Sequence, residues 1–267
     1  MSGRGRVLAI AGSDSGGGAG IQADIKTVTA LGGYAATAIT AITVQNTQGV
    51  SDIHMLPPEL IAAQISAVLG DIGADAIKTG MLGDAATIEA IADRIEEEAE
   101  ALPFVLDPVM MAKGGAPLLP ESAQDVLCRR LLPLASLITP NAPELARLTG
   151  HAIDDTDGLA RAARILARES GASVLAKGGH LPGAEVVDIL IDHGEELRLS
   201  APRIATRHSH GTGCTLASAV ATGLAQGLSL HDAVRRARDY LQRALMRAPG
   251  FGKGHGPLDH GHTMTRF

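Results

Sequence analysis

The sequence predicts an α/β protein with a mostly parallel sheet. Short apolar runs of the β type alternate with amphipathic helical segments along the chain, which is the pattern of parallel sheets covered by helices. Glycine-rich and polar segments follow several of these runs. Because the carboxyl ends of parallel strands meet at one edge of a sheet, these segments predict a binding site at that edge.

The elements are expected in a regular order. In chain order they are strand 7–11, helix 19–31, strand 35–44, helix 58–71, strand 76–79, helix 85–100, strand 104–107, helix 121–131, strand 136–139, helices within 141–149 and 156–170, strand 174–177, strands 186–192 and 195–199, and helices 212–226 and 230–248. The strand segments are rich in Val, Ile and Leu, and the helical segments carry apolar residues three or four positions apart. The two strands before the last helices are predicted to form an antiparallel hairpin turned at His193-Gly194.

Size and composition predict one domain over residues 1–250 and a tail at 251–267. The 267 residues are 45% hydrophobic and 19% charged, as in ordinary soluble proteins. The formal charge of -6 and the lack of a basic block argue against nucleic acid or an anionic membrane as the main partner, and no apolar run approaches the roughly 18 residues of a membrane helix. Two cysteines, Cys128 and Cys214, are too few for a disulfide framework and indicate a reducing cytoplasm.

The segment at 208–215, His-Ser-His-Gly-Thr-Gly-Cys-Thr, is the strongest functional signal. Its glycines let the backbone turn tightly before an apolar helix, and the first amides of a helix have no partner within it. Gly211, Thr212 and Gly213 can therefore hold a phosphate, beside the thiol of Cys214, whose pKa a helix N-terminus commonly lowers. The pattern favours phosphoryl transfer, and the alternative is a tight loop that enters a core helix with an inert cysteine.

Two familiar phosphate-binding motifs are absent from the sequence. The loop from Gly12 to Gly20 is too long for the G-x-G-x-x-G dinucleotide fingerprint, and no lysine stands in a G-x-x-x-x-G-K context. A kinase with this sequence must therefore hold its phosphates in another way.

Polar residues at the ends of three predicted strands are candidates for holding a nucleotide and its metal. Asp107 precedes a proline, which suits either a magnesium ligand or a turn cap. Asn141 and Glu144 follow the next strand, either as a helix-capping pair or, with Asp107, around one hydrated magnesium. Lys177 ends a further strand before two glycines, where it can reach a phosphate or extend into solvent.

Four other polar residues receive no role. Asp188, in the strand VVDIL, is either buried and paired or exposed on an edge strand. His255, His260 and His262 lack the spacing of a zinc site, so we expect them to be solvated in a loosely ordered tail.

Seven segments, in this order, resemble one known family. AGSDSGGGAGIQAD, AITVQNT, IKTGML, DPVM, TPNAPE, KGGH and HGTGCT are similar to the hydroxymethylpyrimidine/phosphomethylpyrimidine kinases of thiamine biosynthesis, within the ribokinase-like superfamily. The resemblance covers residues 6 to about 246 without a large insertion or deletion. The segment His208-Ser-His210 departs slightly from the Asn-Thr-His expected there, and the tail beyond 250 is idiosyncratic.

The resemblance implies an architecture and a reaction. The expected fold is a three-layer α/β/α sandwich with a mostly parallel central sheet, ATP at its carboxyl edge and a small lid over the substrate. The expected reaction is two consecutive phosphorylations of one pyrimidine, first on the hydroxymethyl oxygen and then on the resulting monophosphate. Relatives also suggest a homodimer joined through the lids.

The resemblance also assigns roles to residues of this sequence. Gln45 would hydrogen-bond the aminopyrimidine edge. The substrate pocket would be lined by Gly12, Asp24, Val44, Met81 and Val109. Asp107 and Glu144 would organise Mg²⁺, the nucleotide phosphates would contact Thr139, Asn141 and Lys177, and Gly211, Thr212, Gly213 and Cys214 would form the anion hole. Cys214 stands where most ribokinase-like enzymes carry an aspartate base, and it marks the pyrimidine branch.

Two other functions stay open. One is a pyridoxal or pyridoxine kinase of the same fold, because some members with cysteine in this turn accept vitamin B6 alcohols; a substrate competition assay separates the two. The other is a non-catalytic ligand-binding module with a regulatory role. Loss of Asp107, Lys177 or the GTGC turn would indicate such a module, and all of these are present.

Overall fold

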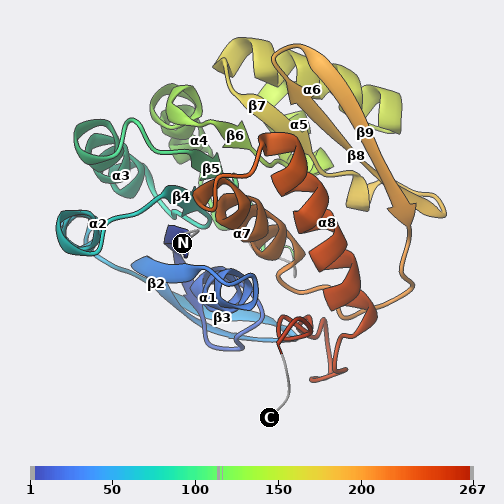
Figure 1. Ribbon diagram of the computed structural model, residues 1–267, viewed down its shortest axis with the longest axis horizontal. Coiled ribbons are helices and arrows are strands. Elements are labelled where there is room, and N and C mark those ends of the chain that lie inside the picture. The colour runs from blue at the N-terminus through green and yellow to red at the C-terminus, as the bar shows by residue number, and fades with distance from the viewer. Residues whose placement is uncertain (1–3, 113–114, 116, 265–267) are drawn as a thin grey trace.

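The computed structural model describes residues 4–112, 115 and 117–264. In this part of the chain, nine strands form one sheet (Figure 1). Across the sheet they are β3 (Gly49–Met55), β2 (Tyr34–Asn46), β1 (Arg6–Asp14), β4 (Ala76–Thr79), β5 (Phe104–Leu106), β6 (Leu137–Ile138), β7 (Ser173–Ala176), β8 (Glu185–Asp192) and β9 (Glu195–Pro202). The run from β2 to β7 is parallel, whereas β3, β8 and β9 each pair antiparallel at the edges. The predicted mostly parallel sheet is confirmed.

Helices cover both faces of the sheet. One face carries α1 (Gly20–Ala30), α7 (Thr212–Ala225) and α8 (Leu230–Met246), and the other carries α2 (Pro58–Asp71), α3 (Ala85–Glu98), α4 (Glu121–Arg130), α5 (Ala142–Thr149) and α6 (Thr156–Ser170) (Figure 1). Two short 3-10 turns lie at Leu132–Leu134 and Gly178–His180. Each face has its own buried apolar cluster because successive side chains of a strand point to opposite faces: on β1, Val7 joins one cluster and Leu8 the other.

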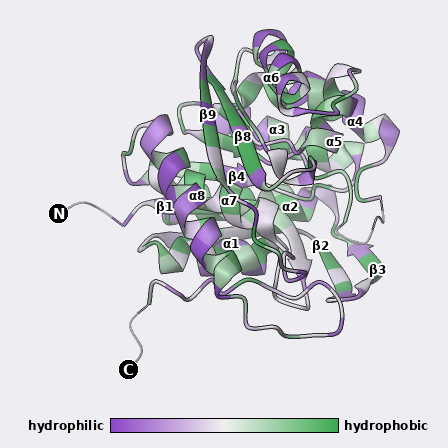
Figure 2. Cartoon of the chain, turned by 90° about the vertical axis from the view of Figure 1, so that its right-hand side faces the viewer, coloured by the Kyte–Doolittle hydropathy of each residue, from purple (hydrophilic) through white to green (hydrophobic). Residues whose placement is uncertain are grey.

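The hydrophobic and hydrophilic residues of the helices are distributed as this layered arrangement requires. In Figure 2 the surface helices α6 and α8 show hydrophilic residues alternating with hydrophobic ones, as expected where one stripe of a helix faces the core. The exception is α7, whose residues from Thr215 to Gly223 are all buried. Among the described residues, no helix is long and apolar enough to cross a membrane.

The predicted elements match with one omission, the strand β3. Its residues are half-buried or exposed, so no apolar run marks it, and it lies at the sheet edge paired with β2. The predicted hairpin of β8 and β9 is confirmed. Its turn residues His193 and Gly194 have φ of 47° and 86°, the left-handed conformation that tight hairpin turns require.

The C-terminal segment 251–264 packs against the rest of the chain, which corrects the expectation of a loosely ordered tail. Leu258 and His260 are each only 4% exposed. Nε2 of His260 lies 2.9 Å from the hydroxyl of Thr215, next to Cys214, and Tyr240 donates a hydrogen bond to the carbonyl of His260. Burial lowers the pKa of His260 to about 4, so the imidazole is neutral at pH 7. The prediction that His260 is solvated is wrong because these long-range contacts leave no periodic trace in the sequence.

Candidate active site

A cavity of about 850 Å³ opens at the carboxyl edge of the parallel strands, within the size range of small-molecule sites. Its wall includes residues at the carboxyl ends of five of these strands: Asp14 ends β1, Asp107 and Lys177 directly follow β5 and β7, and Met81 and Asn141 come two and three residues after β4 and β6. Parallel pairing brings these strand ends together, as the sequence predicts.

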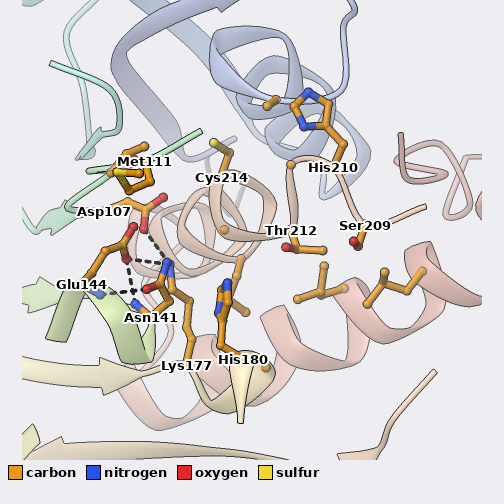
Figure 3. Close-up of a pocket in the computed structure, with 18 of the residues that line it drawn as sticks. Asp107, Met111, Asn141, Glu144, Lys177, His180, Ser209, His210, Thr212 and Cys214 are labelled. Carbon is orange, nitrogen blue, oxygen red and sulfur yellow. Dashed lines mark hydrogen bonds and ion pairs between the residues drawn. The ribbon is translucent and has the colours of Figure 1, made fainter. Parts of the chain in front are cut away.

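The cavity brings together all but three of the predicted site residues. Those that line it are Gly12, Gln45, Met81, Asp107, Val109, Asn141, Glu144, Lys177, Gly211, Thr212, Gly213 and Cys214. Figure 3 shows Asp107, Glu144, Asn141 and Lys177 gathered on one side, His210 on the other, and Cys214 and Thr212 between them.

Asp24, Val44 and Thr139 do not line the cavity, which corrects their expected placement. Val44 follows Thr43 and precedes Gln45 on a strand, so its side chain points to the opposite face, where it is 58% exposed. Thr139 is fully buried and donates a hydrogen bond to Oδ1 of Asp107 over 3.0 Å. Asp24 is fully buried and paired with Lys78.

The start of α7 has the backbone geometry of an anion site. Gly211 has φ of 85°, and a Cβ there would lie 1.8 Å from the carbonyl oxygen of Gly18, so only glycine fits. A Cβ on Gly213 would lie 3.3 Å from Nζ of Lys177 and 3.5 Å from Oδ2 of Asp107. The bare backbone therefore leaves room for a group between the helix start and the lysine, where unpaired amides favour an anion.

The thiol of Cys214 does not have the lowered pKa that the sequence suggests. Burial is the largest influence and raises its pKa to about 11, although the cation of Lys78 and the amide of Gly20 act in the opposite direction. The helix N-terminus favours the thiolate, but the packing of neighbouring elements removes water from it, and this desolvation has the larger effect on the pKa. At pH 7 Cys214 is therefore mainly the protonated thiol.

Lys177 lies between the two carboxylates of the cavity wall, Asp107 and Glu144. Its Nζ lies 2.8 Å from Oδ1 of Asp107 and 4.0 Å from Oε2 of Glu144. Burial alone would lower the pKa of Lys177, but the two carboxylates outweigh it and raise the pKa above its ordinary value. The lysine therefore remains a cation facing the cavity.

Asp107 and Glu144 fit a magnesium ion that takes most of its ligands from elsewhere. Oδ2 of Asp107 is buried without a hydrogen-bond partner among the described residues. The described part of the chain holds no group of three or more His, Cys, Asp or Glu arranged for a metal. Magnesium commonly uses only one or two protein carboxylates, with phosphate oxygens and water completing the shell, and these two residues match that pattern.

Asn141 and Glu144 form the helix-capping pair, which was one of the two alternatives that the sequence predicts for them. Oδ1 of Asn141 accepts from the amide of Glu144 over 2.9 Å, and Oε2 of Glu144 accepts from the amide of Asn141 over 2.8 Å. Burial, together with the like charge of Asp107, raises the pKa of Glu144 despite Lys177. Since both residues also line the cavity, the cap fixes their positions at its wall.

Sequence reasoning assigned no role to three paired polar residues, although for Asp188 it offered the buried and paired state as one of two alternatives. Asp188 accepts from the amide of Gly178 and from Arg238, each over 2.8 Å, and so ties the turn after Lys177 to α8. Asp14 and His210 form a buried pair on the other side of the cavity, at 2.9 Å. The available signal for Asp188 was a carboxylate within an apolar strand, which rarely stays unpaired.

Lys78 is a fourth omission, and it explains Asp24. Both side chains are fully buried, with Nζ 2.8 Å from Oδ1 of Asp24, which also accepts from Ser218 over 2.6 Å. The contact joins β4, α1 and α7 directly beneath the turn that carries Cys214. A lysine inside the short apolar strand AIKT was the signal in the sequence.

Replacing Lys78 with methionine is expected to destabilise the protein by about 3 to 5 kcal/mol, because the buried carboxylate of Asp24 loses its counter-ion. Chemical denaturation measures the free energy of unfolding. The control is the double variant Lys78→Met/Asp24→Asn, which removes both charges and should recover part of the loss. A single variant as stable as the parent would contradict the charge pairing.

Comparison with known proteins agrees with this site. The family model described as phosphomethylpyrimidine kinase matches residues 14–259. The chain is 53% identical over 257 residues to the thiamine biosynthesis bifunctional protein ThiED of Geobacter sulfurreducens, covering 96% of this chain and 52% of that protein. It is 49% identical to a hydroxymethylpyrimidine/phosphomethylpyrimidine kinase of Streptomyces coelicolor, covering 97% of this chain and 95% of that one.

A solved structure gives the same fold. The ADP complex of Bacillus subtilis pyridoxal kinase superposes with a TM-score of 0.89 at 35% identity, covering 97% of this chain and 98% of that one. The matched segment 14–259 contains the glycine turn, the lysine and the carboxylates described above. The chain therefore belongs to the phosphomethylpyrimidine kinase family.

Proposed function

We propose that this kinase phosphorylates the hydroxymethyl oxygen of 4-amino-5-hydroxymethyl-2-methylpyrimidine and then converts the monophosphate to the diphosphate, for thiamine diphosphate biosynthesis. The observation that carries the proposal is the shared cavity, in which the start of α7 faces Lys177 and Asp107, and which Gln45 also lines. The arrangement suits phosphoryl transfer, in which catalysis is mainly positioning and charge stabilisation.

ATP is the proposed phosphoryl donor, and the ADP complex of the pyridoxal kinase with this fold supports it. Lys177 and Asn141 would bind its phosphates, with Thr139 acting through Asp107. The amides of Gly211, Thr212 and Gly213 would hold the transferred group. Magnesium, held by Asp107 and Glu144, would neutralise charge on the phosphate oxygens.

In the first step, the thiolate form of Cys214 would receive the proton of the substrate hydroxyl. The hydroxyl oxygen forms a bond to the γ-phosphorus, the bond from that phosphorus to the β–γ bridging oxygen breaks, and ADP leaves. In the second step, a phosphate oxygen of the monophosphate is the nucleophile and needs no proton removed when it is ionised. The base is therefore required mainly for the first step.

The substrate ring is proposed to lie against Gln45, Gly12, Met81 and Val109. A Cβ on Gly12 would lie 3.1 Å from the sulfur of Met81, so the glycine leaves the thioether as an apolar surface for the ring. The amide of Gln45 can donate and accept at once, which matches a ring nitrogen beside an amino group.

Replacing Gln45 with leucine is expected to lower kcat/KM for the aminopyrimidine by about tenfold or more and to affect pyridoxine much less, since pyridoxine lacks the matching donor and acceptor edge. The measurement is kcat/KM for both alcohols. The matched control is Gln48→Leu, an exposed glutamine three positions along the chain, which should change neither value. Equal losses for both alcohols would contradict the assignment.

Pyridoxal phosphorylation is the second candidate, because the pyridoxal kinase structure superposes over nearly the whole chain. That likeness concerns the fold, whereas the relative from Streptomyces coelicolor that matches over full length is named for the pyrimidine substrates. The parent enzyme should therefore prefer the aminopyrimidine in the assay above.

We also propose that the enzyme is a cytoplasmic homodimer with small-molecule substrates and no nucleic acid or membrane partner. The exposed apolar side chains of Ile42 and Val44 on β2, 44% and 58% exposed, support a contact between chains through the region of β2 and β3. Such a contact would account for the exposure of Val44.

A further inference from the structure

A second polar cluster lines the cavity around His210, which Figure 3 shows on the side away from Lys177. It consists of Asp14, His210, Gln45 and Thr43. Nε2 of His210 lies 2.9 Å from Oδ2 of Asp14 and 3.1 Å from Nε2 of Gln45, and Oε1 of Gln45 lies 3.2 Å from the hydroxyl of Thr43. Asp14 and His210 are only 2% and 7% exposed, so water screens these contacts little.

Asp14 determines which nitrogen of His210 carries a proton. Its carboxylate accepts hydrogen bonds from the amides of Gly16, Gly18 and Ala19 over 2.7, 3.0 and 2.8 Å. Burial would raise the pKa of Asp14, but the hydrogen bonds from His210 and from these backbone amides outweigh it and hold the pKa below its usual value. An ionised carboxylate only accepts, so Nε2 of His210 must present an N–H to it.

That proton also determines how the carboxamide of Gln45 is turned. The oxygen and nitrogen of a carboxamide fill the same space, and the surrounding hydrogen bonds decide between the two orientations. With an N–H on Nε2 of His210, an NH2 group in front of it would place two donors face to face at 3.1 Å. The carbonyl oxygen of Gln45 is the partner that suits His210.

Thr43 requires the same orientation independently. Its hydroxyl has a single hydrogen, which it donates to the carbonyl of Ser13 over 2.9 Å. Towards Gln45 the hydroxyl oxygen therefore acts as an acceptor, which suits the NH2 end of the amide. Both neighbours therefore favour exchanging the two ends of the carboxamide, so that Oε1 of Gln45 faces His210 and Nε2 faces Thr43.

We propose that His210, held by Asp14, is a positioning residue that fixes the orientation of the Gln45 carboxamide and so selects a pyrimidine with an amino group beside the ring nitrogen. The inference rests on the proposed function. The remaining N–H and lone pair of the amide form a donor and acceptor edge of fixed order. Because the hydroxymethyl group must point at Cys214, the substrate ring cannot turn over to adapt to the opposite order.

The informative competitor is the 4-oxo analogue, 5-hydroxymethyl-2-methylpyrimidin-4-one. Its ring N–H donates and its carbonyl accepts, which reverses the order found in the aminopyrimidine. A fixed amide rejects it, since a buried donor facing a donor leaves both unpaired. Freeing the amide of Gln45 to turn should let the enzyme accept it better.

The experiment measures kcat and KM for the aminopyrimidine and the 4-oxo analogue in the parent, His210→Leu and His210→Gln. His210→Leu should reduce the preference for the aminopyrimidine by about tenfold, mainly by raising its KM. His210→Gln, whose amide can still donate to Gln45, should restore most of the preference. His208→Gln is the matched control, since His208 lies in the same segment but does not line the cavity, and it should keep the parent preference.

A double-variant cycle separates positioning from a purely structural role. In a Gln45→Leu background, His210→Leu should change the preference no further, because the residue acts through Gln45. Equal losses for both pyrimidines, or an unchanged preference in His210→Leu with parental melting temperature, would overturn the inference and leave the proposed function standing. A parent enzyme that does not phosphorylate the aminopyrimidine would overturn both.

Discussion

Replacing Cys214 with alanine is expected to slow the first phosphorylation by on the order of 100- to 10,000-fold while ATP binding is kept. The thiol lies at the start of α7 and lines the cavity together with Lys177, where it is placed to take the proton of the substrate hydroxyl. The measurements are the rate of aminopyrimidine phosphorylation and ATP affinity by calorimetry. A variant within a few-fold of the parent would show that the turn acts through its amides alone.

The pH profile and a second variant test the base more directly. Burial raises the pKa of Cys214 to about 11, so the thiolate is the minor form at pH 7. While the pH stays below that pKa, each increase of one pH unit raises the thiolate fraction about tenfold. The kcat/KM of the parent should therefore rise from pH 7 to 9. Cys214→Asp supplies a carboxylate base that is ionised at neutral pH, so the rising limb should disappear. A flat parent profile would contradict a thiolate base.

Replacing Asp107 with asparagine is expected to lower kcat by on the order of 100-fold and to raise sharply the magnesium concentration needed for half-maximal rate. The carboxylate holds Lys177 and Thr139 through Oδ1, while Oδ2 is buried and has no hydrogen-bond partner in the part of the chain that the structure describes. Asparagine keeps the shape and an acceptor oxygen but loses the charge that fits a cation. The measurements are magnesium titrations at fixed ATP and binding of magnesium-ATP by calorimetry.

The control for this variant is Asp239→Asn, which removes an exposed carboxylate of α8 from the same cavity wall. Both variants change the net charge of the cavity equally, but only Asp107 contacts Lys177. Asp239→Asn should leave the magnesium titration unchanged. A titration of Asp107→Asn that matches the parent would remove Asp107 from the metal site.

The sequence indicated most of the fold because the signals are local. Helix 58–71 and strand 76–79 coincide with α2 and β4, since apolar spacing reports which face of an element is buried. The strand β3 was not predicted because an edge strand that is exposed along much of its length has no such apolar spacing. The packing of the C-terminal segment was not predicted for a related reason, since Leu258 and His260 are buried by residues that are distant in the sequence.

Motifs at strand ends, and the family that they resemble, also located most of the site. Gly211 illustrates why: its positive φ and its contact with Gly18 demand glycine, so the backbone requirement is written in the residue type itself. The resemblance placed Asp24 and Val44 in the substrate pocket, but neither lines the cavity. A resemblance assigns a role to a position in the sequence and does not say where the side chain at that position points.

The sequence by itself determined an α/β fold with a glycine turn at the start of a helix, a lysine and two carboxylates at one edge of the sheet. Only the tertiary structure decided how these groups pair. Lys177 meets Asp107 across 70 positions of sequence, Lys78 meets Asp24 across 54, and Asp14 meets His210 across 196. The pKa of Cys214 and the orientation of Gln45 follow from such pairings. Desolvation and hydrogen-bond direction arise from side chains of separate elements, so residue type and local spacing do not contain them.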